Sequence, residues 1–411
     1  MKILLIHCAY KYRGGEDTVF DEETRLLRSN GVEVETLKFD NHDHSLRDFL
    51  FLPFNYPSFK RTVRCLQLFK PDLVHVHNLH FAGSPSVLAA VKKMKLPLVM
   101  TLHNFRLLCP SATLFHNGKP FLRSLYERFP WTAVLRGVYN NSRPYTFWTA
   151  CSMMVHRLFG FWNLPDKYIV LSQHAKGVFQ SGRFQLKNEK MVVKPNFCYV
   201  PLIAEGKKSN YFLYIGRLTE EKGMHLLLDA FSRTELPVKI AGDGPMKDIV
   251  IEYTREHPNI EYISSVDKAA VFALMQEATA LVFPSIWYEG MPLTIIEAFA
   301  SGLPVIASKF GVMENMIVDK HNGLHFNVGS VSDLRQKLHQ WNSFSDTDKR
   351  EFDRYARQTY EQLYTPEVNI LQLLNIYNSA LNRNHVDTGN FQRNDSEIKQ
   401  AASDAHYPGN H

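Results

Sequence analysis

One strand–loop–helix unit at residues 280–300 limits the fold more than any other part of the sequence. Residues 280–283 are a short apolar run closed by Pro284, and the apolar residues after Pro292 suit a helix. Proline is tolerated in the first helical turn, because the N–H groups there have no partner within the helix. A buried strand that enters a helix through a short loop is the repeating unit of a parallel α/β sheet.

Two glutamates, Glu289 and Glu297, stand eight positions apart in this unit. We expect Glu289 on the loop at the helix N-terminus and Glu297 about one turn into the helix. The N–H groups of residues 291–294 would point into the same space, and such an N-terminus attracts phosphate. This layout suits a molecule with hydroxyls at both ends and phosphates between them, such as a sugar nucleotide. The alternative is two ordinary solvated glutamates.

Apolar runs of strand length recur along the chain and alternate with helical patterns. They predict strands at residues 2–7, 33–37, 73–76, 97–102, 168–171 and 192–193, and again at 211–215, 238–241, 260–263, 280–283, 304–307 and 323–326. Continuous apolar strands separated by helices indicate parallel sheets buried on both faces. We therefore expect an α/β protein with two doubly wound, Rossmann-like domains that face each other across a central cleft.

Changes in composition predict the domain boundaries. The first domain spans residues 1–199, and the polar residues 200–210 form a linker. The second domain spans residues 211–365, and a helix at residues 366–382 is expected to pack back toward the first domain. Residues 383–411 are rich in polar side chains and poor in apolar ones, which predicts a disordered tail.

Composition narrows the class of protein. The five cysteines are scattered without a CxxC pair, which argues against a zinc site or a disulfide framework and fits a reducing compartment. The formal charge of +6 favours anionic partners. The N-terminal apolar run is too short for a signal peptide, and no uncharged apolar span reaches the length of a membrane helix. These features predict a cytoplasmic protein.

Polar residues and glycines follow several predicted strands of the first domain. Gly14 and Gly15 follow the first strand, and His77 and His103 end the third and fourth. Ligands of open α/β sheets bind beyond the carboxyl ends of the strands. The alternatives are a simple tight turn at the glycines and histidines that only bond a neighbouring loop.

The second domain carries cations at the corresponding place. Gly216 and Arg217 end its first strand, and Lys222 follows in the string GRLTEEKG. Arginine and lysine both suit a pyrophosphate, although a lysine near a helix start is commonly only solvated. Gly242 ends the next strand in a tight turn, and Ser264 ends the one after it.

The string WYEGMPLTIIEAFA at residues 287–300 resembles the E-x7-E signature of glycosyltransferase family 4, retaining enzymes of the GT-B fold. GRLTEEKG resembles the donor-phosphate motif of the same family, and TLHN at residues 101–104 resembles its strand-end histidine. The resemblance covers about residues 1–380 and is densest at residues 216–311. It implies a first domain on the acceptor side and a second domain that binds a nucleotide sugar.

Carried onto this sequence, the resemblance implies that Glu289 meets the donor sugar, Glu297 the ribose and Ser264 the nucleobase. It places His103 near the anomeric carbon, and Arg217 and Lys222 on the diphosphate. The expected catalytic residues are His103, Arg217, Lys222 and Glu289. The expected donor-binding residues are Gly14, Gly15, Gly216, Gly242, Ser264, Gly290, Met291, Pro292, Leu293 and Glu297.

The implied reaction moves a sugar from a nucleotide diphosphate sugar to an acceptor hydroxyl with retention, in lipopolysaccharide, capsule or exopolysaccharide biosynthesis. Arg217, Lys222 and helix N–H groups would stabilise the departing diphosphate, so no metal or other cofactor is expected. A sugar-nucleotide epimerase or a phosphorylase of the same fold is the alternative enzyme. A non-catalytic sugar-nucleotide-binding subunit is the alternative outside catalysis.

Residues 119–167 mix arginine with tryptophan, tyrosine and phenylalanine and contain few acidic residues. Such a surface suits a membrane interface, with the apolar side chains toward lipid and the cations toward headgroups. We expect peripheral contact with the anionic inner face of the plasma membrane and a saccharide or lipid-linked saccharide acceptor. The alternative is a soluble acceptor with these aromatic side chains in the core. No nucleic-acid-binding module is recognisable.

Overall fold

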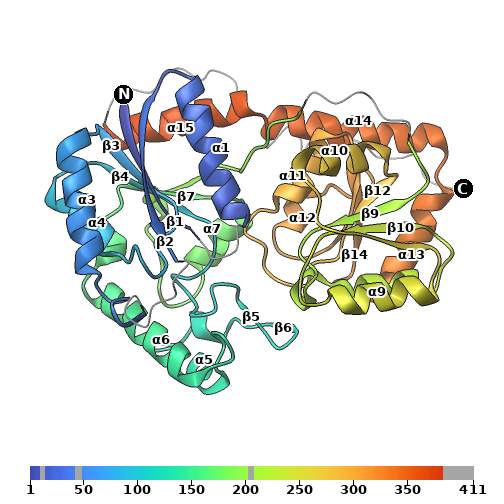
Figure 1. The fold of residues 1–411 in the computed structure, drawn as a ribbon, viewed down its shortest axis with the longest axis horizontal. Helices are drawn as coiled ribbons and strands as arrows, with labels where there is room; N and C mark the ends of the chain where they lie inside the picture. The colour runs from blue at the N-terminus through green and yellow to red at the C-terminus, as the bar shows by residue number, and fades with distance from the viewer. Residues whose placement is uncertain (10–13, 42–48, 202–207, 383–411) are drawn as a thin grey trace, which may run out of the picture.

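Two parallel six-stranded sheets organise the chain into two lobes (Figure 1). The structure is a computed structural model that describes residues 1–9, 14–41, 49–201 and 208–382. The predicted disordered tail and most of the predicted linker therefore lie outside the described residues.

The first sheet has the strand order β2-β1-β3-β4-β7-β8, and all of its strands are parallel. Its strands are β1 (Lys2–Ala9), β2 (Glu33–Asp40), β3 (Leu73–Val76), β4 (Leu98–Leu102), β7 (Lys167–Val170) and β8 (Met191–Val193). Helices that connect them are α1 (Gly15–Ser29), α3 (Tyr56–Phe69), α4 (Ser86–Lys93) and α7 (Gln173–Gln180). The central strands are buried along their whole length, which explains their continuous apolar sequence.

The second sheet repeats this plan with the order β11-β10-β9-β12-β13-β14. Its strands are β9 (Phe212–Ile215), β10 (Val238–Ala241), β11 (Ile260–Ile263), β12 (Ala280–Phe283), β13 (Val305–Ser308) and β14 (Gly323–Phe326). The helices of this lobe are α8 (Met224–Phe231), α9 (Lys247–Glu256), α10 (Lys268–Glu277), α11 (Leu293–Ala300), α12 (Met313–Met316) and α13 (Val331–Ser343). The prediction of two doubly wound α/β units is confirmed.

Two predicted strands were too short. The structure continues β1 to Ala9 and β2 to Asp40, with Cys8 opposite Phe39 in the register. On β2 the residues Lys38 and Asp40 are exposed while Leu37 and Phe39 are buried. This alternation at the sheet edge obscures the end of β2, whereas β1 is an inner strand that stays buried through Cys8.

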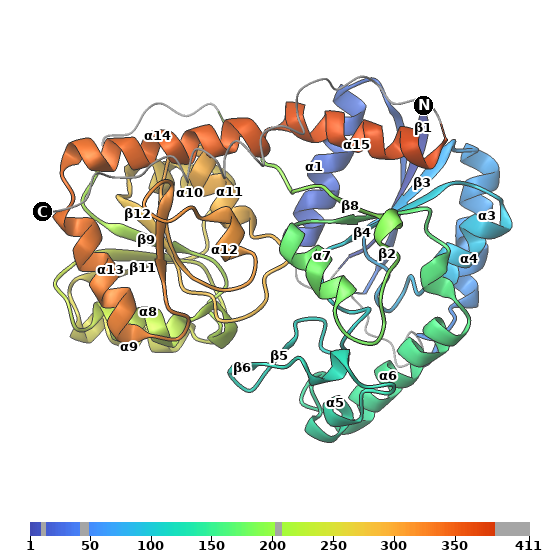
Figure 2. The ribbon, with the colours of Figure 1, turned by 180° about the vertical axis from the view of Figure 1, so that it is seen from behind.

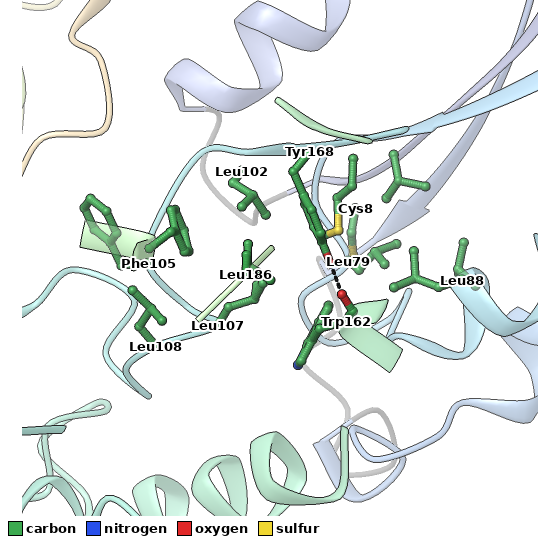
Figure 3. Packing of buried hydrophobic residues seen from close by; sticks show 14 of the residues in the cluster. Cys8, Leu79, Leu88, Leu102, Phe105, Leu107, Leu108, Trp162, Tyr168 and Leu186 are labelled. Carbon is green, nitrogen blue, oxygen red and sulfur yellow. Dashed lines mark hydrogen bonds between the residues drawn. The ribbon is translucent and has the colours of Figure 1, made fainter. Parts of the chain in front are cut away.

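An insertion between β4 and β7 forms a separate layer beside the first sheet (Figures 1 and 2). It contains the short hairpin β5 (Phe115–His116) and β6 (Lys119–Pro120), followed by α5 (Trp131–Arg136) and α6 (Arg143–Leu158). Figure 3 shows the core that joins this layer to the sheet, where the Tyr168 hydroxyl donates a 2.7 Å hydrogen bond to the carbonyl of Trp162. Leu79, Leu102 and Leu186 pack in the same apolar cluster.

The last two helices run along one edge of both lobes (Figure 2). Helix α14 (Asp346–Leu363) packs on α11 of the second lobe. Helix α15 (Pro366–Ala380) places Ile370, Leu373 and Ile376 in a cluster with Ile3 and other core residues of the first lobe. The chain therefore returns to its first lobe after completing the second. Among the described residues, no helix combines the length and the apolar character needed to cross a membrane.

Leu373 tests how far α15 stabilises the first lobe. Because Leu373 is fully buried, Leu373→Ala should lower the free energy of unfolding by about 2–5 kcal/mol. Leu371 on the same helix is 39% exposed, and Leu371→Ala should change it by less than about 0.5 kcal/mol. Chemical denaturation of both variants measures the difference, and equal losses would show that α15 contributes only its helical propensity.

Candidate active site

The predicted site residues lie beyond the carboxyl ends of the strands in both lobes. Gly14 and Gly15 follow β1, His103 follows β4, and Gly216 and Arg217 follow β9. In each sheet the strand order reverses at the first strand, β1 or β9, which is where open α/β sheets bind ligands. Gly242 follows β10, and the exposed Ser264 follows β11 at the edge of the second sheet.

The loop before α11 lies against the first lobe. A Cβ atom on Gly290 would collide with the carbonyl oxygen of His103, so only glycine fits between the two lobes at this point. Asn196 donates its side-chain N–H to the carbonyl of Met291 at 3.3 Å. A Cβ atom on Gly15 would lie 3.9 Å from the Leu293 side chain, so the glycine loop also reaches the start of α11. The structure thus brings together the motifs of both lobes.

Glu289 and Lys222 form an ion pair at the centre of this arrangement. The Lys222 Nζ atom lies 2.7 Å from Glu289 Oε1, and the Ser285 hydroxyl donates to the same oxygen at 2.8 Å. The Lys222 ammonium also lies 5.1 Å from the centre of the Trp287 ring. The next residue, Gly223, has φ +75° and leaves no room for a Cβ atom beside the carbonyl of Pro284. This close approach holds the lysine over the loop that carries the glutamate.

Arg217 supplies a second cation near the same strand end. Its side chain is exposed and has no ion-pair partner among the residues that the structure describes. The Tyr214 hydroxyl donates to the Arg217 carbonyl at 2.9 Å and so orders the turn. A Cβ atom on Gly242 would collide with the carbonyl of Gly216, so glycine is required where these two turns pack together. An exposed guanidinium in an ordered turn is suited to bind a phosphate.

Helix α11 begins at Leu293, with Pro292 as its N-cap residue in an extended conformation. No side chain caps the first turn, and although the Ile295 N–H donates to the Pro292 carbonyl at 3.3 Å, the N–H groups of Leu293 and Thr294 have no partner among the described residues and can bind an anion. Glu297 lies one turn further, near the ion pair that Lys268 forms with Glu22 across the lobes at 2.9 Å. Burial raises the pKa of Glu297 to about 7, although Lys268 opposes the rise. The predicted positions of both glutamates on the loop and helix are confirmed.

His103 and His77 are in contact, with His103 Nε2 3.0 Å from His77 Nδ1. Burial lowers the pKa of His77 to about 4 and that of His103 well below its usual range, so both rings are neutral at pH 7. The two histidines line a cavity of about 70 Å³ between the sheet and α6. Its wall also includes Asn104, Arg106 and apolar side chains, so this recess is mainly apolar with a few polar groups.

A buried polar cluster, which was not predicted from the sequence, lies next to His77. Glu23 on α1 contacts His77, His75 and Lys194, and each of these side chains is buried. Glu23 lies among Val19, Phe20, Leu26 and Leu27 on the buried face of α1. A carboxylate on the apolar face of an amphipathic helix was the signal that could have indicated it.

The only group of potential metal ligands in the described part of the chain is formed by Glu23, His75 and His77, whose ligand atoms lie within 4.8 Å of one another. Their polar atoms already have partners. The Lys194 ammonium lies 3.1 Å from the second oxygen of Glu23, and the Tyr377 hydroxyl lies 2.7 Å from His75 Nδ1. A buried ammonium at this distance opposes a second cation, so the donor set fits a hydrogen-bonded cluster better than a metal.

The arginine- and aromatic-rich segment divides between core and surface. Trp162 is buried, and Arg157 is partly buried and donates to the Leu107 carbonyl at 2.8 Å. By contrast, Trp131 and Phe147 are 56% and 42% exposed and stack with their ring centres 6.1 Å apart. The outer arginines are exposed, namely Arg123, Arg128, Arg136 and Arg143. Some aromatic side chains of the segment are therefore in the core, and others lie exposed on the surface beside arginines.

Family comparisons agree with this geometry. The family "Glycosyl transferase 4-like domain" matches residues 6–172, and "Glycosyl transferases group 1" matches residues 203–359. The chain belongs to the family 4-type glycosyltransferases. The two matches fall on the two lobes, so this glycosyltransferase has the GT-B architecture that its sequence predicted.

Two relatives and one solved structure illustrate the likeness. The alpha-monoglucosyldiacylglycerol synthase of Acholeplasma laidlawii is 25% identical over 79% of this glycosyltransferase and 81% of its own length. The O-antigen chain mannosyltransferase C of Escherichia coli is 28% identical over 42% of the chain and 47% of its own length. The structure of HepE from Anabaena in complex with UDP and glucose superimposes with a TM-score of 0.61 at 18% identity, covering 92% of this chain and all of that one.

The raised pKa of Glu297 predicts a pH-dependent cost in stability. The unfolded carboxyl ionises near its ordinary pKa of 4.5, whereas the folded one holds its proton to about pH 7. Stability from this group is thus complete below pH 4.5 and is lost as the pH rises toward 7. The free energy of unfolding of Glu297→Gln should therefore exceed that of the parent by roughly 1–3 kcal/mol at pH 8 and equal it at pH 4. Denaturation midpoints at both pH values measure it, and a gain of equal size at both would contradict the titration.

Proposed function

We propose that this glycosyltransferase moves a sugar from a nucleotide diphosphate sugar to an acceptor hydroxyl with retention of the anomeric configuration. The main support is the arrangement of three features around one loop. The loop carries Glu289, which pairs with Lys222, it leads into the uncapped N-terminus of α11, and at Gly290 it lies against the carbonyl of His103. Cations and N–H groups suit the diphosphate, and carboxylates suit the hydroxyls of sugar and ribose. The UDP and glucose named for HepE agree with such a donor.

The departing diphosphate gains one negative charge, on the oxygen that was bonded to the sugar, as the bond to the anomeric carbon breaks. Arg217, Lys222 and the first N–H groups of α11 would stabilise this charge without reorganisation. Glu289 already accepts hydrogen bonds from Lys222 and Ser285, which favours a role in holding the sugar over attack as a nucleophile. We therefore propose front-face transfer through an oxocarbenium-like state, with no requirement for a metal or another cofactor.

A panel of labelled nucleotide sugars, offered with and without membrane lipids, tests the function. Transfer to an acceptor that persists in excess EDTA, with the donor's anomeric configuration in the product by NMR, is the expected result. Interconversion of the donor sugar without an acceptor would instead identify an epimerase. Tight nucleotide binding with no turnover would identify a non-catalytic subunit, and inversion in the product would remove the front-face mechanism.

Lys222→Ala should reduce kcat by about 10²–10³-fold, because it removes one preorganised partner of the leaving group. Because the Glu289 side chain is only 6% exposed and would keep only the Ser285 hydroxyl as a hydrogen-bond donor, cooperative unfolding of the variant is checked before its kinetics are measured. Arg233→Ala, an exposed cation elsewhere on the second lobe, is the matched control and should leave kcat unchanged. Steady-state kinetics of the folded variants measures kcat, and an unchanged kcat in Lys222→Ala would rule out a role of Lys222 in stabilising the leaving group.

We further propose that the acceptor is a lipid or a lipid-linked saccharide at the inner face of the plasma membrane. The insertion presents Trp131, Tyr145 and Phe147 to solvent beside exposed arginines. The segment that precedes α3 adds Leu50 and Phe51, and Phe49 contacts the Tyr145 ring at 4.7 Å between centres. These exposed side chains lie on the same lobe as the recess at His103, so membrane contact would bring the acceptor toward that lobe.

The names of the two relatives are consistent with this acceptor. By their names, one is a synthase of alpha-monoglucosyldiacylglycerol and the other is a mannosyltransferase of an O-antigen chain. For the present chain we propose a place in the assembly of a glycolipid or surface polysaccharide.

Flotation with anionic liposomes tests the membrane contact. At low salt the protein should rise with the vesicles, and the triple variant Arg123→Glu, Arg128→Glu, Arg136→Glu should stay at the bottom. Each cation near an anionic surface contributes about 1 kcal/mol, so the three reversals should abolish binding.

The matched control makes the same change of charge on the second lobe, at Arg233, Lys320 and Arg350, which are exposed. It should still float. If both triple variants lose binding equally, net charge alone is responsible and the insertion has no special role.

A further inference from the structure

A continuous chain of polar atoms runs from the buried face of α1 to His103. Glu23 Oε1 lies 3.2 Å from His77 Nε2, and His77 Nδ1 lies 3.0 Å from His103 Nε2. Glu23 and His77 are fully buried, so water cannot substitute for either contact. His103 itself is partly exposed at the carboxyl end of β4.

The charge at the start of this chain is fixed. Burial alone would raise the pKa of Glu23, but Lys194, His77 and His75 together hold it well below its usual range. Glu23 is therefore a carboxylate, which can only accept hydrogen bonds. Lys194 lies 3.1 Å from its second oxygen and 3.0 Å from the Asn369 side-chain oxygen on α15. The pair keeps the buried cluster neutral overall.

The position of each proton then follows. A neutral imidazole has one N–H, and the carboxylate of Glu23 requires it on His77 Nε2. His77 Nδ1 is then bare and can only accept, so the single proton of His103 must sit on its Nε2. His103 Nδ1 is left as a lone pair, and it has no hydrogen-bond partner among the residues that the structure describes.

We propose that Glu23 is a positioning residue that acts through His77 to hold His103 in the Nε2-protonated tautomer, so that His103 Nδ1 accepts a hydrogen bond from a hydroxyl of the bound sugar. This rests on the proposed function for the identity of the ligand. Without Glu23, His77 would be free to turn its proton toward His103, and His103 would then present an N–H donor instead. Such a donor cannot accept the proton of a hydroxyl.

Removing Glu23 alone would leave the Lys194 ammonium buried without its counter-charge and risk unfolding. The test variant is therefore Glu23→Leu with Lys194→Met, which replaces both charges by apolar groups of similar size. Tyr377→Phe is the matched control, because the Tyr377 hydroxyl contacts His75 and lies outside the chain from Glu23 to His103. Both variants should unfold cooperatively, as checked by calorimetry.

The first readout is the tautomer, measured without substrate. Long-range ¹H–¹⁵N spectra of the ¹⁵N-histidine-labelled full chain report which ring nitrogen carries the proton, and the His103 signals are assigned by their loss in His103→Gln. Nε2 protonation in the parent and in Tyr377→Phe, with a mixture of tautomers in the double variant, is the expected result. Nδ1 protonation in the parent, or an unchanged tautomer in the double variant, would overturn the proposal.

The second readout is kinetic. The double variant should lose about tenfold in kcat with less than about a threefold change in the KM of the donor, and tenfold corresponds to about 1.4 kcal/mol. Tyr377→Phe should keep the parent's kcat. A stoichiometric bound metal in the purified protein, found by elemental analysis, would assign Glu23, His75 and His77 to a metal site and refute the proposal. Because the tautomer is read without a donor, its result stands even if the proposed donor is wrong.

Discussion

The close approach of Gly290 to the carbonyl of His103 is the contact on which the candidate site depends. It joins the loop that carries Glu289 to the end of β4 in the other lobe, and there is no space for a side chain between them. Backbone against backbone gives a shorter and more rigid contact than any pair of side chains. Because of it, groups from two separately folded sheets share one site.

Cations and carboxylates are then ordered by the strands that carry them. Lys222 enters from the turn after β9 and Glu289 from the loop after β12, and these two strands are neighbours in the second sheet. Their pairing at 2.7 Å holds both side chains in place before a ligand arrives. Such preorganisation means that binding and charge stabilisation require little rearrangement.

The first lobe contributes in a different way, through a buried cluster. Glu23 and Lys194 are both inaccessible to water, and α15 completes their surroundings through Asn369. A buried ion pair is weak support for stability, since apolar side chains would fill the same space at lower cost. Its contact with His77, which in turn contacts His103, is consistent with a role in the site in addition to any role in stability. The return of α15 to the first lobe thus bears on the site as well as on the fold.

Local patterns in the sequence determined the strands, the turns and the residues at their ends. Short apolar runs mark buried parallel strands, and the glycines, Arg217, Lys222 and the two glutamates follow them directly, so their placement at one sheet edge could be predicted. The sequence also indicated the family, through two strings of eight and fourteen residues. The end of β2 was missed because this edge strand alternates between buried and exposed residues instead of staying apolar.

Only the tertiary structure decided which groups meet. Glu23 is 54 residues from His77 and 171 residues from Lys194 in the sequence, and no local rule links them. The exposed and buried aromatics of the insertion also look alike in sequence, and packing against the sheet separates Trp162 from Trp131. Burial and long-range contact are properties of the whole fold, so the proton state of His103 and the shape of the site follow from the assembled lobes.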